Sequence, residues 1–195
     1  MGPMPPAWAE SILRVALGPR EFESVAGDLL EEYRDTLVPQ RGQSGADAWY
    51  LFQVSVFVGR RAGVWALLFG GAFLARTALD AFAPTTDFST RSAISTYLGV
   101  GLLLTAGCWA AVRSGSLFAG TIVGFATTAL GAIVSILGAS ILLGVWHDAA
   151  TMEAIRGSGG VSEIFSLPLM LMMPGVLLGT IGGLMGSAIR SLQSA

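Results

Sequence analysis

The sequence predicts an all-α integral membrane protein in which a short N-terminal cytosolic helical head precedes a four-helix transmembrane body. Of its 195 residues, 53% are apolar and 12% are charged, and the mean hydropathy is +0.66. About a quarter of the residues of an ordinary soluble domain are charged. The charges are also uneven, because residues 1–61 carry 8 of the 13 acids and 6 of the 11 bases. We therefore divide the chain into a head, residues 1–61, and a membrane body, residues 62–195.

Three amphipathic segments make up the predicted head. The first begins after Pro5 and Pro6 and ends at Gly18, and Pro19 begins the second, as is typical of helix ends. The apolar residues of the second segment recur at helical spacing on one face: Phe22, Val25, Ala26, Leu29, Leu30, Tyr33 and Leu37. The opposite face carries the acids Asp28, Glu31, Glu32 and Asp35. This pattern predicts a helix with one buried side and one solvated side.

The third segment begins after a break at Pro39 and Gly42. Ser44 and Asp47 offer an N-terminal capping pair for it, and we expect its helix to continue into the first membrane span. The aromatic residues of the three segments are predicted to lie in a small core, since a head of about 60 residues needs every apolar group available. These residues are Trp8, Phe22, Tyr33 and Trp49.

Four apolar stretches form the predicted membrane body. They cover residues 62–83, 93–112, 117–146 and 167–189. Each is long enough to cross about 30 Å of hydrocarbon as a helix, which satisfies its own backbone hydrogen bonds there. The lipid bilayer is therefore the first predicted partner. Pro168 is expected in the first turn of the fourth span, and Pro174 is expected to kink it.

The arginines at the ends of the spans predict the orientation. Arg60, Arg61, Arg113 and Arg190 fall on one side of the membrane, and Arg91 and Arg156 fall on the other. Because positive residues concentrate in cytosolic segments, we expect both termini in the cytoplasm.

Small residues recur every four positions in the last two spans. Gly175, Gly179 and Gly183 form one row, and Gly131 belongs to another. Such rows let two helices approach closely, so we interpret them as packing between the third and fourth spans. Homo-oligomerisation and a glycine-lined path are the alternatives.

One pair of charges lies inside the first span. Arg76 and Asp80 are four residues apart and therefore share a helix face. Ionisable residues within spans are candidates for function. We interpret them as a structural ion pair near the membrane boundary, and an ion or proton path is the alternative.

Several classes of chemistry lack the residues they need. The chain has no Lys, so it has no phosphate-binding loop of the Walker type, and Cys108 and His147 are its only Cys and His. We therefore predict no enzyme, no cofactor and no metal, although His147, Asp148, Glu153 and Glu163 could be assembled into a site. The net charge of −2 argues against nucleic-acid binding.

The head resembles a known module. Pro5-Pro6, the string GDLLEEY at 27–33, and Ala48-Trp49-Tyr50 followed by Gln53 are similar to the permease prefix domain (type 2), found ahead of bacterial ABC-type permeases. The resemblance covers about the first 60 residues and implies a helical module on the cytosolic side of a bacterial inner membrane. The chain ends after four spans, leaving no room for a large periplasmic domain, so the resemblance does not extend to permease activity.

Two functions follow as hypotheses. The first is an accessory or regulatory inner-membrane protein, associated with an export permease, whose head docks another protein through Asp28, Glu31, Glu32 and Asp35. The alternative is a small oligomeric channel or transporter subunit. A solvated acidic face with no partner is the simpler interpretation of the same four residues.

Overall fold

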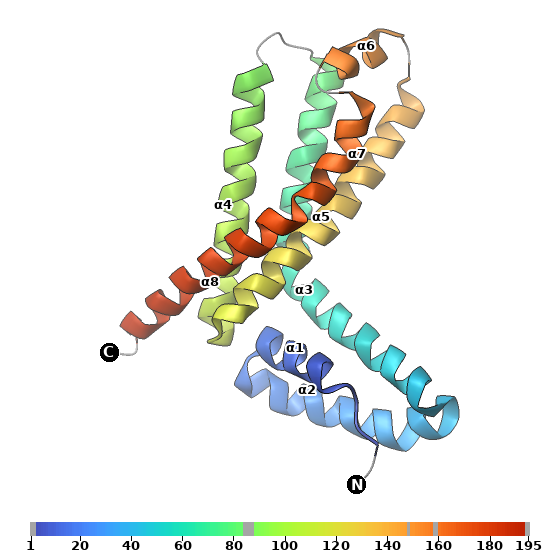
Figure 1. Ribbon diagram of the computed structural model, residues 1–195, viewed down its shortest axis with the longest axis vertical. Coiled ribbons are helices and arrows are strands. Elements are labelled where there is room, and N and C mark those ends of the chain that lie inside the picture. The colour runs from blue at the N-terminus through green and yellow to red at the C-terminus, as the bar shows by residue number, and fades with distance from the viewer. Residues whose placement is uncertain (1–2, 84–87, 148, 158–159, 194–195) are drawn as a thin grey trace.

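The described fold is built from helices joined by short turns. The computed structural model describes residues 3–83, 88–147, 149–157 and 160–193, and no strand occurs among them (Figure 1). Four helical runs are long and apolar enough to cross a membrane. They are Glu21–Phe82, Ser89–Ser114, Leu117–Val145 and Val161–Gln193. The predicted all-helical class with four apolar helices is therefore confirmed.

The head consists of three short elements and the start of a long helix. They are α1 (Ala7–Leu17), α2 (Pro19–Glu32) and the π-helical turn η1 (Tyr33–Leu37). Gly18 separates α1 from α2 with a φ of 79°, a conformation that glycine adopts without steric cost. A Cβ atom at this position would also lie 3.1 Å from the backbone of Ser114. Gly18 thus allows both the turn and the close approach of the head to the body.

Helix α3 (Val38–Phe82) belongs to both the head and the body. It is interrupted near its start at Gly42, where φ is 68° and ψ is 174°. The predicted break at Pro39 and Gly42 therefore falls at Gly42, while Pro39 sits in the first helical turn. Beyond Gly42 the helix runs across the boundary between residues 61 and 62, changing direction where it enters the body (Figure 1).

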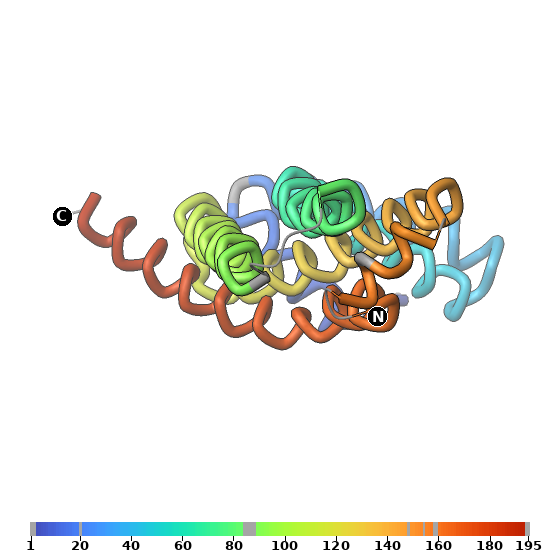
Figure 2. Tube along the Cα trace, turned by 90° about the horizontal axis from the view of Figure 1, so that it is seen from above, coloured from blue at the N-terminus to red at the C-terminus, as the bar shows by residue number. Residues whose placement is uncertain are grey.

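The remaining helices complete the body. They are α4 (Phe88–Ser114), α5 (Leu117–Val145), α6 (Ala149–Gly157), α7 (Val161–Met170) and α8 (Met172–Gln193). Helix α5 packs against α3, α4, α7 and α8. Viewed from above, α8 crosses obliquely along one side of the bundle (Figure 2).

The fourth span differs from the single helix predicted for residues 167–189. It consists of α7 and α8, which meet at Leu171, where ψ is −3°. Pro168 lies buried inside α7 instead of starting a helix, and Pro174 lies in the first turn of α8. Pro174 thus marks the division into two helices, because it has no backbone N–H to donate to the carbonyl of Met170, where α7 ends.

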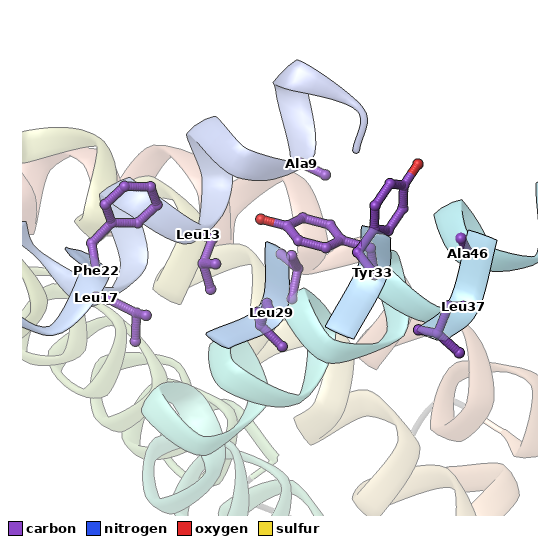
Figure 3. Close-up of a cluster of buried hydrophobic side chains, with 10 residues drawn as sticks. Ala9, Leu13, Leu17, Phe22, Leu29, Tyr33, Leu37 and Ala46 are labelled. Carbon is purple, nitrogen blue, oxygen red and sulfur yellow. The ribbon is translucent and has the colours of Figure 1, made fainter. Parts of the chain in front are cut away.

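The head core is built from large side chains. Leu13, Phe22 and Tyr33 (Figure 3) are each less than 10% exposed, as is Tyr50. The rings of Tyr33 and Tyr50 meet edge to face, with their centroids 6.0 Å apart. The apolar face predicted for the second segment is therefore correct at Phe22, Leu29, Tyr33 and Leu37. The prediction for Trp8 is wrong, since Trp8 is 59% exposed. Helix α1 instead buries Ala9, Leu13, Ala16 and Leu17.

Candidate functional site

The acidic residues of the head form an exposed face. Asp28, Glu31 and Glu32 project from α2 and Asp35 from η1, and all four are exposed. None of them takes part in an ion pair with the residues that the structure describes. The intervening residues Leu29 and Tyr33 point into the head core. The fold therefore uses one side of this helical run and leaves its carboxylates free to contact other molecules. We call these four residues the acidic face.

Tyr33 takes part in a network of hydrogen bonds within the head. The Tyr33 hydroxyl donates to Asp47 Oδ1 at 2.5 Å, and the Gln43 side chain donates both to Tyr33 and to the carbonyl of Met4. Burial, together with the neighbouring Asp47 carboxylate, raises the pKa of Tyr33 to about 12. Asp47 therefore holds Tyr33 in place, whereas the sequence predicted a capping role with Ser44.

A second charged group lies at the end of the body away from the head. The predicted pair is close, with Arg76 Nε 3.7 Å from Asp80 Oδ2. Asp80 has a nearer partner in Arg91 of α4, at 2.8 Å, and Arg76 also lies 3.6 Å from Glu163 of α7. The four residues therefore join α3, α4 and α7, and we call them the charged cluster.

Asp80 is the most buried member of the charged cluster. It is 7% exposed, and Arg91 also donates to the carbonyl of Ala83. A buried carboxylate is costly unless it is paired and hydrogen-bonded, and Arg91 meets both needs. The sequence pattern revealed only the Arg76–Asp80 pair, because spacing along one helix does not show contacts with other helices.

The glycine row of the fourth span lies against the third. A Cβ atom added at Gly175 would overlap with Thr128 of α5, and one added at Gly183 would overlap with Leu117. A Cβ atom added at Gly179 would overlap with Gly120 and Gly124 of the same helix. Gly131 differs from the prediction, because its neighbours are Ala66, Phe69 and Gly70 of α3. It therefore packs the third span against the first, not against the fourth.

Helix α8 has a second close contact, with α4, beside the one predicted with α5. Cβ atoms at Gly182 and Gly186 would overlap with the backbone of Leu104 and Cys108 in α4. Gly107 of α4 in turn approaches the backbone of Gly179. The signal was present in the sequence, since Gly182 and Gly186 repeat at a spacing of four. Two glycine-bearing faces therefore seat α8 against two helices at once.

The described residues contain no group of three or more His, Cys, Asp or Glu side chains that could hold a metal ion. Asp148, one of the residues considered for such a site, lies outside them. A comparison of the chain with family models, curated proteins and solved structures finds no match. The resemblance of the head to the permease prefix domain therefore stays a prediction.

Proposed function

We propose that this protein is an accessory or regulatory membrane protein whose head binds a basic segment of another protein. The acidic face carries the proposal. Its four carboxylates share one side of a helical run, are exposed, and have no ion pair with a described residue. Like charges at this spacing repel one another by a few tenths of a kcal/mol per pair. A basic partner helix would relieve that repulsion.

We further propose that the head lies in the cytoplasm of a bacterial cell, below the inner membrane, and that the partner belongs to an export permease system. The resemblance of residues 1–60 to the permease prefix domain suggests this setting. The placement of arginines supports the orientation, because Arg61 pairs with Glu21 of the head and Arg190 donates to the carbonyl of Val112 at 3.2 Å. Arg91 lies at the other end of the bundle.

Affinity capture from native membranes with the full chain tests the docking proposal. The double variant Glu31→Gln/Glu32→Gln keeps the size of both side chains and removes two charges. We expect the double variant to capture much less of a partner protein than the wild type captures. We also expect salt near 0.5 M to release the same partner from the wild type, since interactions between exposed charges are screened at that concentration.

Glu23→Gln is the matched control. Glu23 is an exposed acid of the same helix, but it lines the crevice between the head and the loop after α4. Its substitution should leave capture unchanged. Equal capture by the double variant and the wild type would rule out docking through the acidic face.

Cysteine labelling tests the orientation. On a Cys108→Ser background, a cysteine replacing Ser44 in the head should resist an impermeant thiol reagent in intact cells. A cysteine replacing the exposed Glu153 of α6 should react. The reverse pattern would place the head outside the cytoplasm.

A further inference from the structure

Two hollows adjoin at the end of the body away from the head. The smaller, of ≈ 30 Å³, lies between α3, α5 and α7, and the larger, of ≈ 340 Å³, is a groove between α3, α4, α7 and α8. Arg76 and Glu163 line both of them. The larger volume is within the range of sites that hold small molecules, about 300–1,000 Å³.

The lining of the groove has an apolar part and a polar part. Its apolar part is lined by Phe69, Phe73, Leu103, Leu171 and Leu178. Arg76, Glu163, Ser92 and Thr96 supply the polar lining. A molecule that fills the groove therefore needs an apolar chain joined to a polar group.

The charges at the polar end are a loosely held pair of opposite sign. Arg91 lies 2.8 Å from Asp80 and satisfies that buried carboxylate. Arg76 and Glu163 face each other across 3.6 Å, beyond the 2.7–3.2 Å of a direct hydrogen bond of this kind. The Glu163 side chain is also 42% exposed. Both charges can therefore accept a better partner without leaving Asp80 unpaired.

The smaller hollow provides an independent polar group. Ser135 of α5 lines it and is 2% exposed. A volume of ≈ 30 Å³ exceeds the roughly 10–15 Å³ that one water needs. A water held there by Ser135 would keep the inner side of the Arg76–Glu163 pair hydrated.

We propose that the groove binds a zwitterionic phospholipid from the leaflet opposite the head. One acyl chain lies along the apolar lining, the phosphate binds the Arg76 guanidinium, and the ammonium group binds the Glu163 carboxylate. The two protein charges match the two lipid charges in number and sign. An anionic headgroup lacking the ammonium would satisfy Arg76 alone and would face the carboxylate of Glu163. This inference does not depend on any partner of the acidic face.

Competition between two lipids in the full-length protein tests the site. The protein is reconstituted in vesicles containing equal amounts of phosphatidylethanolamine and phosphatidylglycerol with identical chains, then extracted in mild detergent, and bound lipids are counted by native mass spectrometry. We expect a retained phosphatidylethanolamine and a preference of about tenfold over phosphatidylglycerol, consistent with a hydrogen bond to a charged group. Equal retention of the two lipids would overturn the proposal.

Two pairs of variants locate the binding. Glu163→Gln should abolish most of the headgroup preference, and Glu153→Gln, an exposed acid of α6, should not. Gly99→Leu places a side chain in the groove, where its Cβ would lie 3.5 Å from Phe69, and it should abolish lipid retention. Gly101→Leu on the outer side of α4, where a Cβ meets nothing within 4 Å, should not. Unchanged preference in Glu163→Gln contradicts the proposal even if Gly99→Leu fails to fold.

Discussion

The head and the α8 interfaces are both helical, but they are held together in different ways. The head core uses bulky residues, with Leu13, Tyr33 and Tyr50 almost completely buried. The interfaces of α8 use glycines, and there the backbone of one helix contacts the backbone of another, as at Gly179 and Gly120. The same secondary structure is thus stabilised by side-chain burial in one region and by close backbone approach in the other.

The contrast is the one expected of a head in water and a body in a lipid bilayer. Burial of large apolar side chains is favourable when the alternative is exposure to water. A lipid tail is as apolar as leucine, so spans gain little from burying leucines and more from small residues that increase dispersion contacts. The exposed apolar residues of the body agree with this view, since Leu137, Ile141 and Leu177 are each more than half exposed.

The largest expected effect comes from filling the glycine interface. Gly179→Leu places a branched side chain where even a Cβ would overlap with Gly120 and Gly124 of α5. Helix α8 must then move away and lose contacts with α5 and α4. We expect a cost of several kcal/mol, measured as a markedly lower melting temperature in detergent. Met185→Leu, at a position that is 51% exposed, should have almost no effect, and equal melting temperatures would contradict the contrast.

The stability of the head should depend on keeping its buried positions apolar, whereas the stability of the α8 interfaces depends on keeping theirs small. Leu29→Asp buries a carboxylate without a partner at a position that is 9% exposed, and it should cost several kcal/mol. Glu31→Gln on the acidic face should be nearly neutral. Limited proteolysis of the head distinguishes them, and equal resistance of the two variants would mean that the head core is not held by apolar burial.

Alkaline pH should destabilise the head by less than Leu29→Asp does. The pKa of Tyr33 is about 12 in the folded head against 10.0 for an ordinary tyrosine, so the unfolded chain loses this proton first. The stabilising contribution is complete below pH 10 and falls as the pH rises through 12. Tyrosinate absorbance should therefore increase in two phases, with the later phase reduced in Tyr33→Phe. Loss of only the early phase in that variant would show that Tyr33 is not the protected group.

The smallest effect is expected from two neighbouring threonines of α5. Thr127 is fully buried, and its hydroxyl has no partner among the described residues, whereas Thr128 donates to the carbonyl of Phe125 at 2.9 Å. Thr127→Val should leave stability unchanged or raise it by up to about 1 kcal/mol, and Thr128→Val should lower it by about 0.5–1 kcal/mol. Melting temperatures compare them, and a larger loss for Thr127→Val would point to a partner for its hydroxyl.

Patterns within one helix predicted much of the fold. Periodicity placed Leu29 and Tyr33 inside and Glu31 outside, and continuous apolar length identified the four helices that can cross a membrane. The prediction failed at Trp8, because α1 is short and apolar on two adjacent rows. Burial of Ala9 and Leu13 shifts the buried face by one position.

Contacts between helices were harder to predict. The spacing of Arg76 and Asp80 indicated their proximity, but it contained no information on Arg91 or Glu163, which come from other helices. The row containing Gly131 likewise indicated a packing face, but the neighbour predicted for it, the fourth span, is wrong, because Gly131 packs against α3. Which two faces meet depends on the arrangement of all the helices, and that is a property of the whole bundle.

The passage of α3 through both regions has a consequence for chain length. Val58 packs against the head core and also against the body core that includes Ala62, so no flexible linker separates them. Inserting one residue between Val54 and Ala62 would rotate the head by about 100° and shift it by about 1.5 Å relative to the body. Both cores can therefore form together only at one rotation of the head relative to the body. We expect substitutions in this stretch to be tolerated far better than insertions or deletions.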